Sequence, residues 1–358
     1  MTTSEVRGST HTSPHWIRGG WYLVSLFGLL GGLGFALLLG IGIGSVQVPL
    51  PTVAAVIVDH LLGRDPRPGT ADQIVWQFRA PRVLLAALAG AGLAVSGTML
   101  QAVVRNPLAD PYVLGLSQGA GLGATVVIVL GTGALSGLGV SAAAFLGALA
   151  SLAAVVILGQ RAGQFVPTRL VLAGVAVGYL LSAMTNFFQF HANPEQLRSV
   201  VFWLLGSVAG AAWDQLWLPA LCVATVTIWA MTQNRRLNAL LLGDEAAIAV
   251  GVSVHRFRLQ ILVASALLTG TIVAVAGGIG FVGLIVPHVV RFLVGPDHRR
   301  VLPFAALLAA VFLVVVDVLA RTIDPPSDLP LSVLTAAVGS PFFLWLLRRP
   351  GRIAGAAG

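Results

Sequence analysis

The sequence is dominated by apolar blocks that are about as long as a lipid bilayer is thick, and these blocks recur along the whole chain. Hydrophobic residues occupy 57% of the 358 positions and charged residues only 9%, whereas ordinary soluble domains carry roughly 25% charged residues. A helix needs about 20 apolar residues to cross a bilayer. The sequence therefore predicts an all-α integral membrane protein with about ten transmembrane helices.

Polar or turn-forming segments separate the expected spans. We place these spans at residues 21–43, 83–104, 112–131, 137–159, 169–190, 214–232, 258–277, 279–294, 302–321 and 331–347. An export signal is the alternative for the first run, but that run exceeds a signal core of about 7–15 residues and lacks a clear cleavage site. Two further segments are too short to cross. The segment at 52–62 is expected to lie at the interface, and the one at 199–210 to be re-entrant or on the surface.

The basic residues predict the orientation of the chain. All 21 are arginine, and they lie between the apolar blocks rather than on one face or in one tail, so nucleic acid is not an expected partner. With the N-terminus inside and alternating spans, most arginines fall on the inside, as the positive-inside rule requires. We therefore expect both termini inside, with tails at 1–18 and 350–358 and one transmembrane domain at 19–349.

Several classes of enzyme are excluded by what the sequence lacks. Without lysine, the chain can form neither a Walker A phosphate site nor a Schiff base. The single Cys222 cannot form an internal disulfide or a thiolate metal site, and its apolar surroundings predict a small buried side chain. No H-E-x-x-H, G-x-S-x-G or pair of catalytic carboxylates occurs. We expect no catalytic residue and no metal site.

The longest inside loop, at 233–258, reads QNRRLNALLLGDEAAIAVGVSVHRFR. Its pattern predicts two short helices. The first ends at Gly243, and the second is capped by Asp244 and ends at Gly251. Neither helix can span the membrane. Two interpretations remain open: a connector that lies on the membrane, or a docking element that inserts into a cytoplasmic partner.

Three polar features interrupt the apolar blocks. The elbow at 105–111 carries an arginine, an asparagine and two prolines between two small-residue-rich runs, and lies on the inside. Asp317 and Arg321 are four residues apart, so we expect them to pair across one helical turn near the outer end; proton coupling through Asp317 is the alternative. His288 follows Pro287, where we expect a helix kink and a hydrogen-bonded structural histidine rather than a proton relay or ligand.

Taken in order, a set of motifs resembles the FecCD-type permeases of ABC importers for iron-siderophores, haem and vitamin B12. The motifs are R-x-P-R at 79–82, G-x6-G-x3-Q at 90–101, RNPLADP with LG-S-GA at 105–120, GGIGFVGLIVPHVVR at 277–291, GPDHR at 295–299, and LP, TA, G and PFF between 329 and 343. The similarity extends over about 21–349.

The resemblance implies a prokaryotic plasma-membrane protein and a set of partners. These are a second permease subunit, as homo- or heterodimer, two cytoplasmic ABC ATPase subunits and an extracytoplasmic substrate-binding protein. The chain itself is expected to bind no cofactor, because ATP and Mg²⁺ bind to the ATPase. The expected cargo is a ferric siderophore or similar metal chelate, with haem or cobalamin as alternatives. An ion-coupled secondary transporter is the alternative from another class, although it would need midplane carboxylates.

The resemblance also assigns residues to three sites. A cytoplasmic gate is assigned to Asn106 and Leu108, with a second gate segment at Pro167 and Thr168. Contact with the ATPase is assigned to the two short helices, at Leu241, Gly243, Asp244, Glu245, Ala247 and Gly251. Docking of the binding protein is assigned to Arg79, Arg82, Arg321 and Asp328. At Asp328 the family usually has glutamate, so the charge is kept on a shorter side chain.

Overall fold

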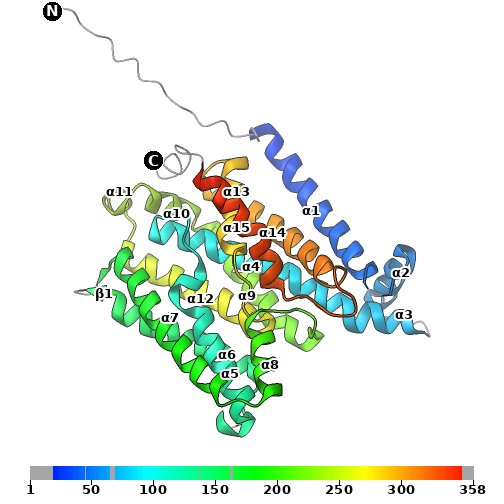
Figure 1. Cartoon of the computed structure of the whole chain (residues 1–358). Coiled ribbons are helices and arrows are strands. Elements are labelled where there is room, and N and C mark those ends of the chain that lie inside the picture. The colour runs from blue at the N-terminus through cyan, green and yellow to red at the C-terminus, as the bar shows by residue number, and fades with distance from the viewer. Residues whose placement is uncertain (1–18, 45, 65–68, 136, 162–163, 349–358) are drawn as a thin grey trace, which may run out of the picture.

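The computed structural model describes residues 19–44, 46–64, 69–135, 137–161 and 164–348 (Figure 1). The expected tails at 1–18 and 350–358 lie outside these residues. Within the described ranges the chain is helical except for loops and one short antiparallel hairpin, β1 (Gln160–Arg161) and β2 (Gln164–Phe165). The expectation of an all-α architecture is confirmed.

Ten described helices coincide with the ten expected spans. They are α1 (Gly19–Gly42), α4 (Ala80–Val104), α5 (Leu116–Leu130), α6 (Val140–Gly159), α7 (Pro167–Phe190), α9 (Trp213–Thr232), α12 (Val254–Ala276), α13 (Val282–Val294), α14 (His298–Ala320) and α15 (Leu331–Leu347). Seven of the described helices are long and apolar enough to cross a membrane, and α5, α13 and α15 are shorter apolar helices.

One span is longer than expected. α3 (Thr70–Asp72) and the π-helical η1 (Gln73–Arg79) run directly into α4, so that one helix of 35 residues extends from Thr70 to Val104. The sequence predicted that this span begins at residue 83, after Arg79 and Arg82. The helix continues through both arginines because partners within the chain satisfy their guanidinium groups, as described below.

Four shorter helices lie between the spans in the described ranges: α2 (Leu50–Leu61), α8 (Pro194–Leu204), α10 (Asn234–Leu241) and α11 (Asp244–Ala249). The boundaries predicted for the second of these, at 199–210, were wrong. Asn193 and Gln196 form a reciprocal capping box that starts α8 at Pro194, and the chain turns at Gly206, whose φ is +73°. Two 3₁₀ turns complete the described elements, η2 (Pro111–Leu114) and η3 (Thr132–Leu135).

α4 lies at the centre of the bundle, between α14, α12, α13 and α9 (Figure 1). Small residues allow its neighbours to approach closely. A Cβ atom on Gly90 would lie 2.2 Å from the carbonyl oxygen of Ala309 in α14, and one on Gly97 would lie 1.9 Å from that of Gly283 in α13. The backbones of these helices are therefore in direct contact with α4.

α14 defines two ends of the bundle. At its start, the Tyr22 hydroxyl of α1 donates to the Arg300 carbonyl at 3.3 Å, and Asn238 of α10 contacts His298. At its other end, Arg321 donates to the Gly40 carbonyl near the end of α1 at 2.7 Å. We call these the α10 end and the α2 end.

Candidate functional site

The elbow between α4 and η2 forms a fixed turn at the α10 end. Arg105 adopts a left-handed backbone conformation with φ +53°, which is uncommon for a residue with a side chain. The Asn106 side chain accepts a hydrogen bond from the Leu108 N–H at 2.9 Å, and Asp110 accepts one from the Tyr112 N–H at 2.8 Å. Asparagine and aspartate stabilise turns in this way. The exposed Leu108 side chain therefore stands on a short, internally bonded loop.

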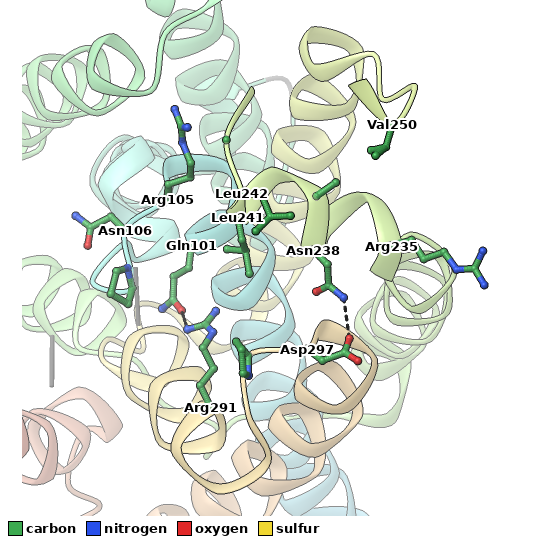
Figure 2. A pocket seen from close by; sticks show the side chains of 14 residues that line it. Gln101, Arg105, Asn106, Arg235, Asn238, Leu241, Leu242, Val250, Arg291 and Asp297 are labelled. Atoms are coloured by element: carbon green, nitrogen blue, oxygen red, sulfur yellow. Dashed lines mark hydrogen bonds between the residues drawn. The ribbon is translucent and has the colours of Figure 1, made fainter. Parts of the chain in front are cut away.

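Gln101, one turn before the elbow, holds the loop from inside the protein. Its side chain is almost fully buried, and its amide nitrogen donates to the carbonyls of Ala109 and Gly283 at 3.2 and 3.3 Å. Its carbonyl oxygen accepts a hydrogen bond from Arg291 of α13. Figure 2 shows the Gln101 and Arg291 side chains pointing toward each other. The sequence placed Gln101 in a motif but gave it no role; here it joins the elbow to α13.

A cavity of ≈ 860 Å³ opens beside the elbow (Figure 2). Three parts of the chain line it: the end of α4 with the elbow, the α10–α11 loop, and the last turn of α13 with the turn before α14. The lining residues are Gln101, Arg105, Asn106, Pro107, Arg235, Asn238, Ala239, Leu241, Leu242, Gly243, Val250, Arg291, Pro296 and Asp297. The structure thus brings the first expected gate segment next to the expected ATPase-coupling loop.

Asn238 attaches α10 to the turn before α14. Its amide nitrogen donates to the Asp297 carboxylate at 2.7 Å, and its oxygen accepts from the His298 N–H at 3.0 Å. Burial alone would raise the pKa of Asp297, but hydrogen bonds from Asn238 and the Arg299 N–H, with the charges of Arg299 and His298, lower that pKa below its usual value. The pair is a fixed attachment point that the sequence did not reveal.

Asp244 does not cap α11, contrary to the sequence prediction. It is the first residue of the helix, and no side chain caps the preceding Gly243. Its carboxylate instead accepts two hydrogen bonds from Arg258 of α12, at 2.7 and 3.0 Å, and lies 3.7 Å from the Arg105 guanidinium. Arg258 outcompetes the helix N-terminus because its guanidinium carries a full charge and binds both carboxylate oxygens at once.

The remaining residues of the α10–α11 loop divide into buried and exposed sets. Ala247 is fully buried and supports α11 from inside, whereas Glu245 is exposed. Gly243 and Gly251 have φ values of +109° and +84° and mark the ends of the two helices, as predicted. Three large apolar side chains that we did not single out are exposed at 62–77%: Leu242, Ile248 and Val250. The spacing of apolar residues in these short amphipathic helices could have identified this exposed apolar face from the sequence.

The second expected gate segment begins α7. Pro167 and the exposed Thr168 are the first residues of that helix, directly after the β1–β2 hairpin. The Phe165 carbonyl in β2 accepts a hydrogen bond from Arg258 at 3.1 Å. Further along α7, a Cβ atom on Gly174 would lie 2.1 Å from the Val113 carbonyl of η2. The turn that directly follows the elbow is therefore in backbone contact with the helix that the second gate segment begins.

At the α2 end, the four residues assigned to docking line one smaller pocket of ≈ 340 Å³. Arg82 of α4 pairs with Asp317 of α14 at 2.9 Å and with Asp328 at 2.9 Å. Arg321 pairs with Asp317 at 3.0 Å, which confirms the predicted pairing across one helical turn. Asp317 is completely buried between the two arginines.

Two of these arginines also connect the ends of helices. Arg79 donates to the carbonyls of Ile41 and Gly42 at 3.0 Å each and to that of Val46. Arg79 and Arg321 are each only 7% exposed. Docking through them stays a prediction, and the structure gives both arginines partners inside the chain. Arg82 and Asp328, with 12% and 36% of their side chains exposed, are more accessible.

His288 differs from the prediction. Its ring is 3% exposed, and its Nε2 atom has no hydrogen-bond partner in the described part of the chain. The prediction of a hydrogen-bonded histidine is therefore wrong for this nitrogen. The rings of Phe292 and Phe342 instead meet the imidazole edge-on, with centroids 4.8 and 6.1 Å away. Among the described residues, no three His, Cys, Asp or Glu side chains gather where they could hold a metal ion.

Comparison with known proteins gives a consistent result. Residues 32–349 match the sequence profile of the FecCD transport family. The vitamin B12 import permease BtuC of Salmonella paratyphi A is 39% identical, over 78% of this chain and 84% of BtuC. The hemin transport permease HmuU of Yersinia pestis is 42% identical, over 77% of this chain and 83% of HmuU. A solved inward-facing metal-chelate type ABC transporter superimposes with a TM-score of 0.80 at 32% identity, covering 91% of this chain and 99% of that one.

Proposed function

The chain belongs to the FecCD transport family, and from this premise we propose that the cargo of this ABC importer permease is an intact metal chelate, with a ferric siderophore as the first candidate. The permeases for vitamin B12 and hemin that resemble it make cobalamin and haem the alternatives. In a chelate the organic ligand already fills the metal's coordination sphere. The protein would therefore recognise the shape and polarity of the chelator rather than ligate the metal.

The observation that carries the proposal is the α10–α11 loop beside the elbow. It presents Leu242, Ile248 and Val250 to solvent, whereas Asn238 and Asp244 attach it to the rest of the protein through hydrogen bonds to Asp297 and to the buried Arg258. A small apolar surface held rigidly from behind is suited to docking against another protein. We propose that each ABC ATPase subunit, which binds ATP and Mg²⁺, docks here, and that a second permease subunit completes the complex.

The same reasoning gives an orientation in the plasma membrane. The α10–α11 loop and the starts of helices α12 and α14 carry Arg235, Arg236, Arg256, Arg299 and Arg300. Positively charged residues are concentrated on the cytoplasmic side of membrane proteins. The α10 end would then be cytoplasmic, with the start of α1 and the end of α15, and the α2 end would face the binding protein. Docking there would involve Arg82 and Asp328 first.

We place the gate at the elbow and at the start of α7. Leu108 would form the constriction, with Asn106 bracing its backbone, and Pro167 and Thr168 would form the second part. This assignment agrees with the position of the elbow next to the docking loop. It does not require any catalytic residue in this chain.

Transport assays with purified components test the proposal. Proteoliposomes that contain the permease, its ATPase and the binding protein should take up a ferric siderophore, haem or cobalamin when ATP is supplied to the cytoplasmic face. The matched control replaces the Walker A lysine of the ATPase and should abolish uptake. Uptake by the permease alone, driven by a proton gradient, would instead establish a secondary transporter.

A further inference from the structure

We infer that the Asp244–Arg258 ion pair is the joint through which the α10–α11 loop moves both gate segments together. The inference rests on the proposed function, because it assumes that the elbow and the start of α7 form the gate. It adds a specific pair of positioning residues, one of which, Arg258, no sequence argument had singled out.

The pair has a fixed geometry. The Arg258 side chain is 4% exposed and donates through both terminal nitrogens to the two oxygens of Asp244, at 3.0 and 2.7 Å. Such a two-point contact fixes orientation as well as distance, because the guanidinium and the carboxylate are both planar. The start of α11 therefore cannot rotate relative to α12 without breaking at least one of these hydrogen bonds.

Arg258 also reaches the second gate segment. The nitrogen that contacts Asp244 Oδ2 donates to the Phe165 carbonyl at 3.1 Å. Phe165 is 3% exposed, and its ring stacks on His255 of α12 with centroids 4.4 Å apart. Phe165 lies two residues before Pro167, so displacement of Arg258 would pull on the chain that begins α7.

Asp244 reaches the first gate segment directly. Its Oδ1 atom lies 3.7 Å from Arg105, whose left-handed backbone is followed at once by Asn106. This contact is about 40% exposed on both sides and is therefore weaker than the one to Arg258. One carboxylate thus contacts the elbow and, through one arginine, the segment that precedes α7.

The polar attachment of the loop at Asn238 leads to α14 rather than to a gate segment. Asn238 fixes α10 to Asp297 and His298 at the start of α14, which is not part of either gate segment. A push on the exposed face of α11 would therefore turn the loop about the Asn238 attachment and displace Asp244. The shared contacts of Asp244 would pass that displacement to both gate segments at the same time.

The test uses Arg258→Lys and Arg258→Gln in the complete transporter, with Arg256→Gln as the matched control. Arg256 lies on the same helix, is exposed and is not engaged by the ion pair. Because Arg258 is buried behind the docking face, both variants should still bind the ATPase. We expect uptake per ATP hydrolysed to fall about tenfold, within the usual range for loss of coupling between sites, and the control to match the wild type.

A double-mutant cycle separates a joint from a merely structural contact. Asp244→Asn and Arg258→Gln should each reduce uptake per ATP, and the double variant should be no worse than either single one. The inference would be overturned if the two single losses in uptake per ATP added up in the double variant. It would also be overturned if ATP hydrolysis, uptake and thermal stability all fell in equal proportion. If neither Arg258 variant assembles, the same test can be made with Asp244→Asn and spin labels at positions 108 and 168. The inference requires that ATP shifts both labels together in the wild type and no longer does so in Asp244→Asn.

The outcomes also distinguish this inference from the proposed function. A wild-type complex that fails to move any of the three chelates with ATP contradicts the proposed function. If the wild-type complex transports and the Arg258→Gln variant keeps the full uptake per ATP, only the inference about the Asp244–Arg258 pair is contradicted.

Discussion

Replacing Arg82 with glutamine tests whether the charged cluster at the α2 end is chiefly structural. In the wild type, the fully buried Asp317 lies between Arg82 and Arg321, at 2.9 and 3.0 Å. Removing one partner of a buried ion pair typically costs about 3–5 kcal/mol, because the remaining charge loses its compensation. Since Arg321 stays in place, we expect a loss near the lower limit, about 3 kcal/mol.

Asp328→Asn provides the matched control, because it removes the other carboxylate partner of the same arginine. The Asp328 side chain is 36% exposed, and exposed ion pairs contribute only about 0–1 kcal/mol. Free energies of unfolding, measured by denaturant titration in mixed micelles, should therefore differ between the two variants by about 2 kcal/mol or more.

Equal losses for the two variants, or an unchanged stability of Arg82→Gln, would refute this reasoning. An unchanged stability would mean that Arg82 is held ready for a partner rather than needed by Asp317, and equal losses would mean that its pair with Asp328 matters as much as its pair with Asp317. Binding-protein affinity measured on the same preparations then separates the two roles, because a purely structural arginine lowers stability without a specific effect on affinity in the molecules that remain folded.

Three further predictions follow from other contacts. Gly90→Ala should lower thermal stability, because its Cβ would lie 2.2 Å from the Ala309 carbonyl, whereas Gly28→Ala, which meets nothing within 4 Å, should not. Leu108→Ala should increase passive leak of chelate from proteoliposomes and Leu108→Trp should reduce ATP-driven uptake; a change in expression alone would count against a gate. Asp328→Arg should weaken capture of the binding protein, most strongly at low salt because exposed charges are screened, and a salt-independent affinity would contradict docking at this residue.

The spans could be read from the sequence because the bilayer dictates their length, and apolar blocks of that length have few other uses. The helix ends at Gly243 and Gly251 were also predicted correctly, because both glycines adopt the positive φ values that end helices. The start of α8 was missed although Asn193 and Gln196 have the spacing of a capping box. The prediction followed the apolar run after these two residues and therefore began the helix too late.

The polar contacts at both ends were less accessible to sequence reasoning. Asp317 and Arg321 could be paired because they are four residues apart, but Arg82, which contacts Asp317, lies 235 positions away. A local rule predicted that Asp244 caps a helix, but its carboxylate instead pairs with Arg258, 14 residues later. Local rules fail where a buried charge needs a partner, because the free energy of compensating that charge exceeds the stabilisation from a cap.

α4 and α14 connect the two sites through a direct contact between their backbones. α4 carries Arg82 at the α2 end and Gln101 at the α10 end, while α14 carries Asp317 at the α2 end and begins at His298, beside Asn238. Between these ends the two backbones touch where Gly90 meets Ala309, and at that point Gly90 has no side chain that could change rotamer and absorb a shift. A tilt that follows the loss of Arg82 must therefore move both helices together. For this reason we expect Arg82→Gln to reduce ATP-driven uptake even in the fraction of protein that remains folded and retains its binding protein.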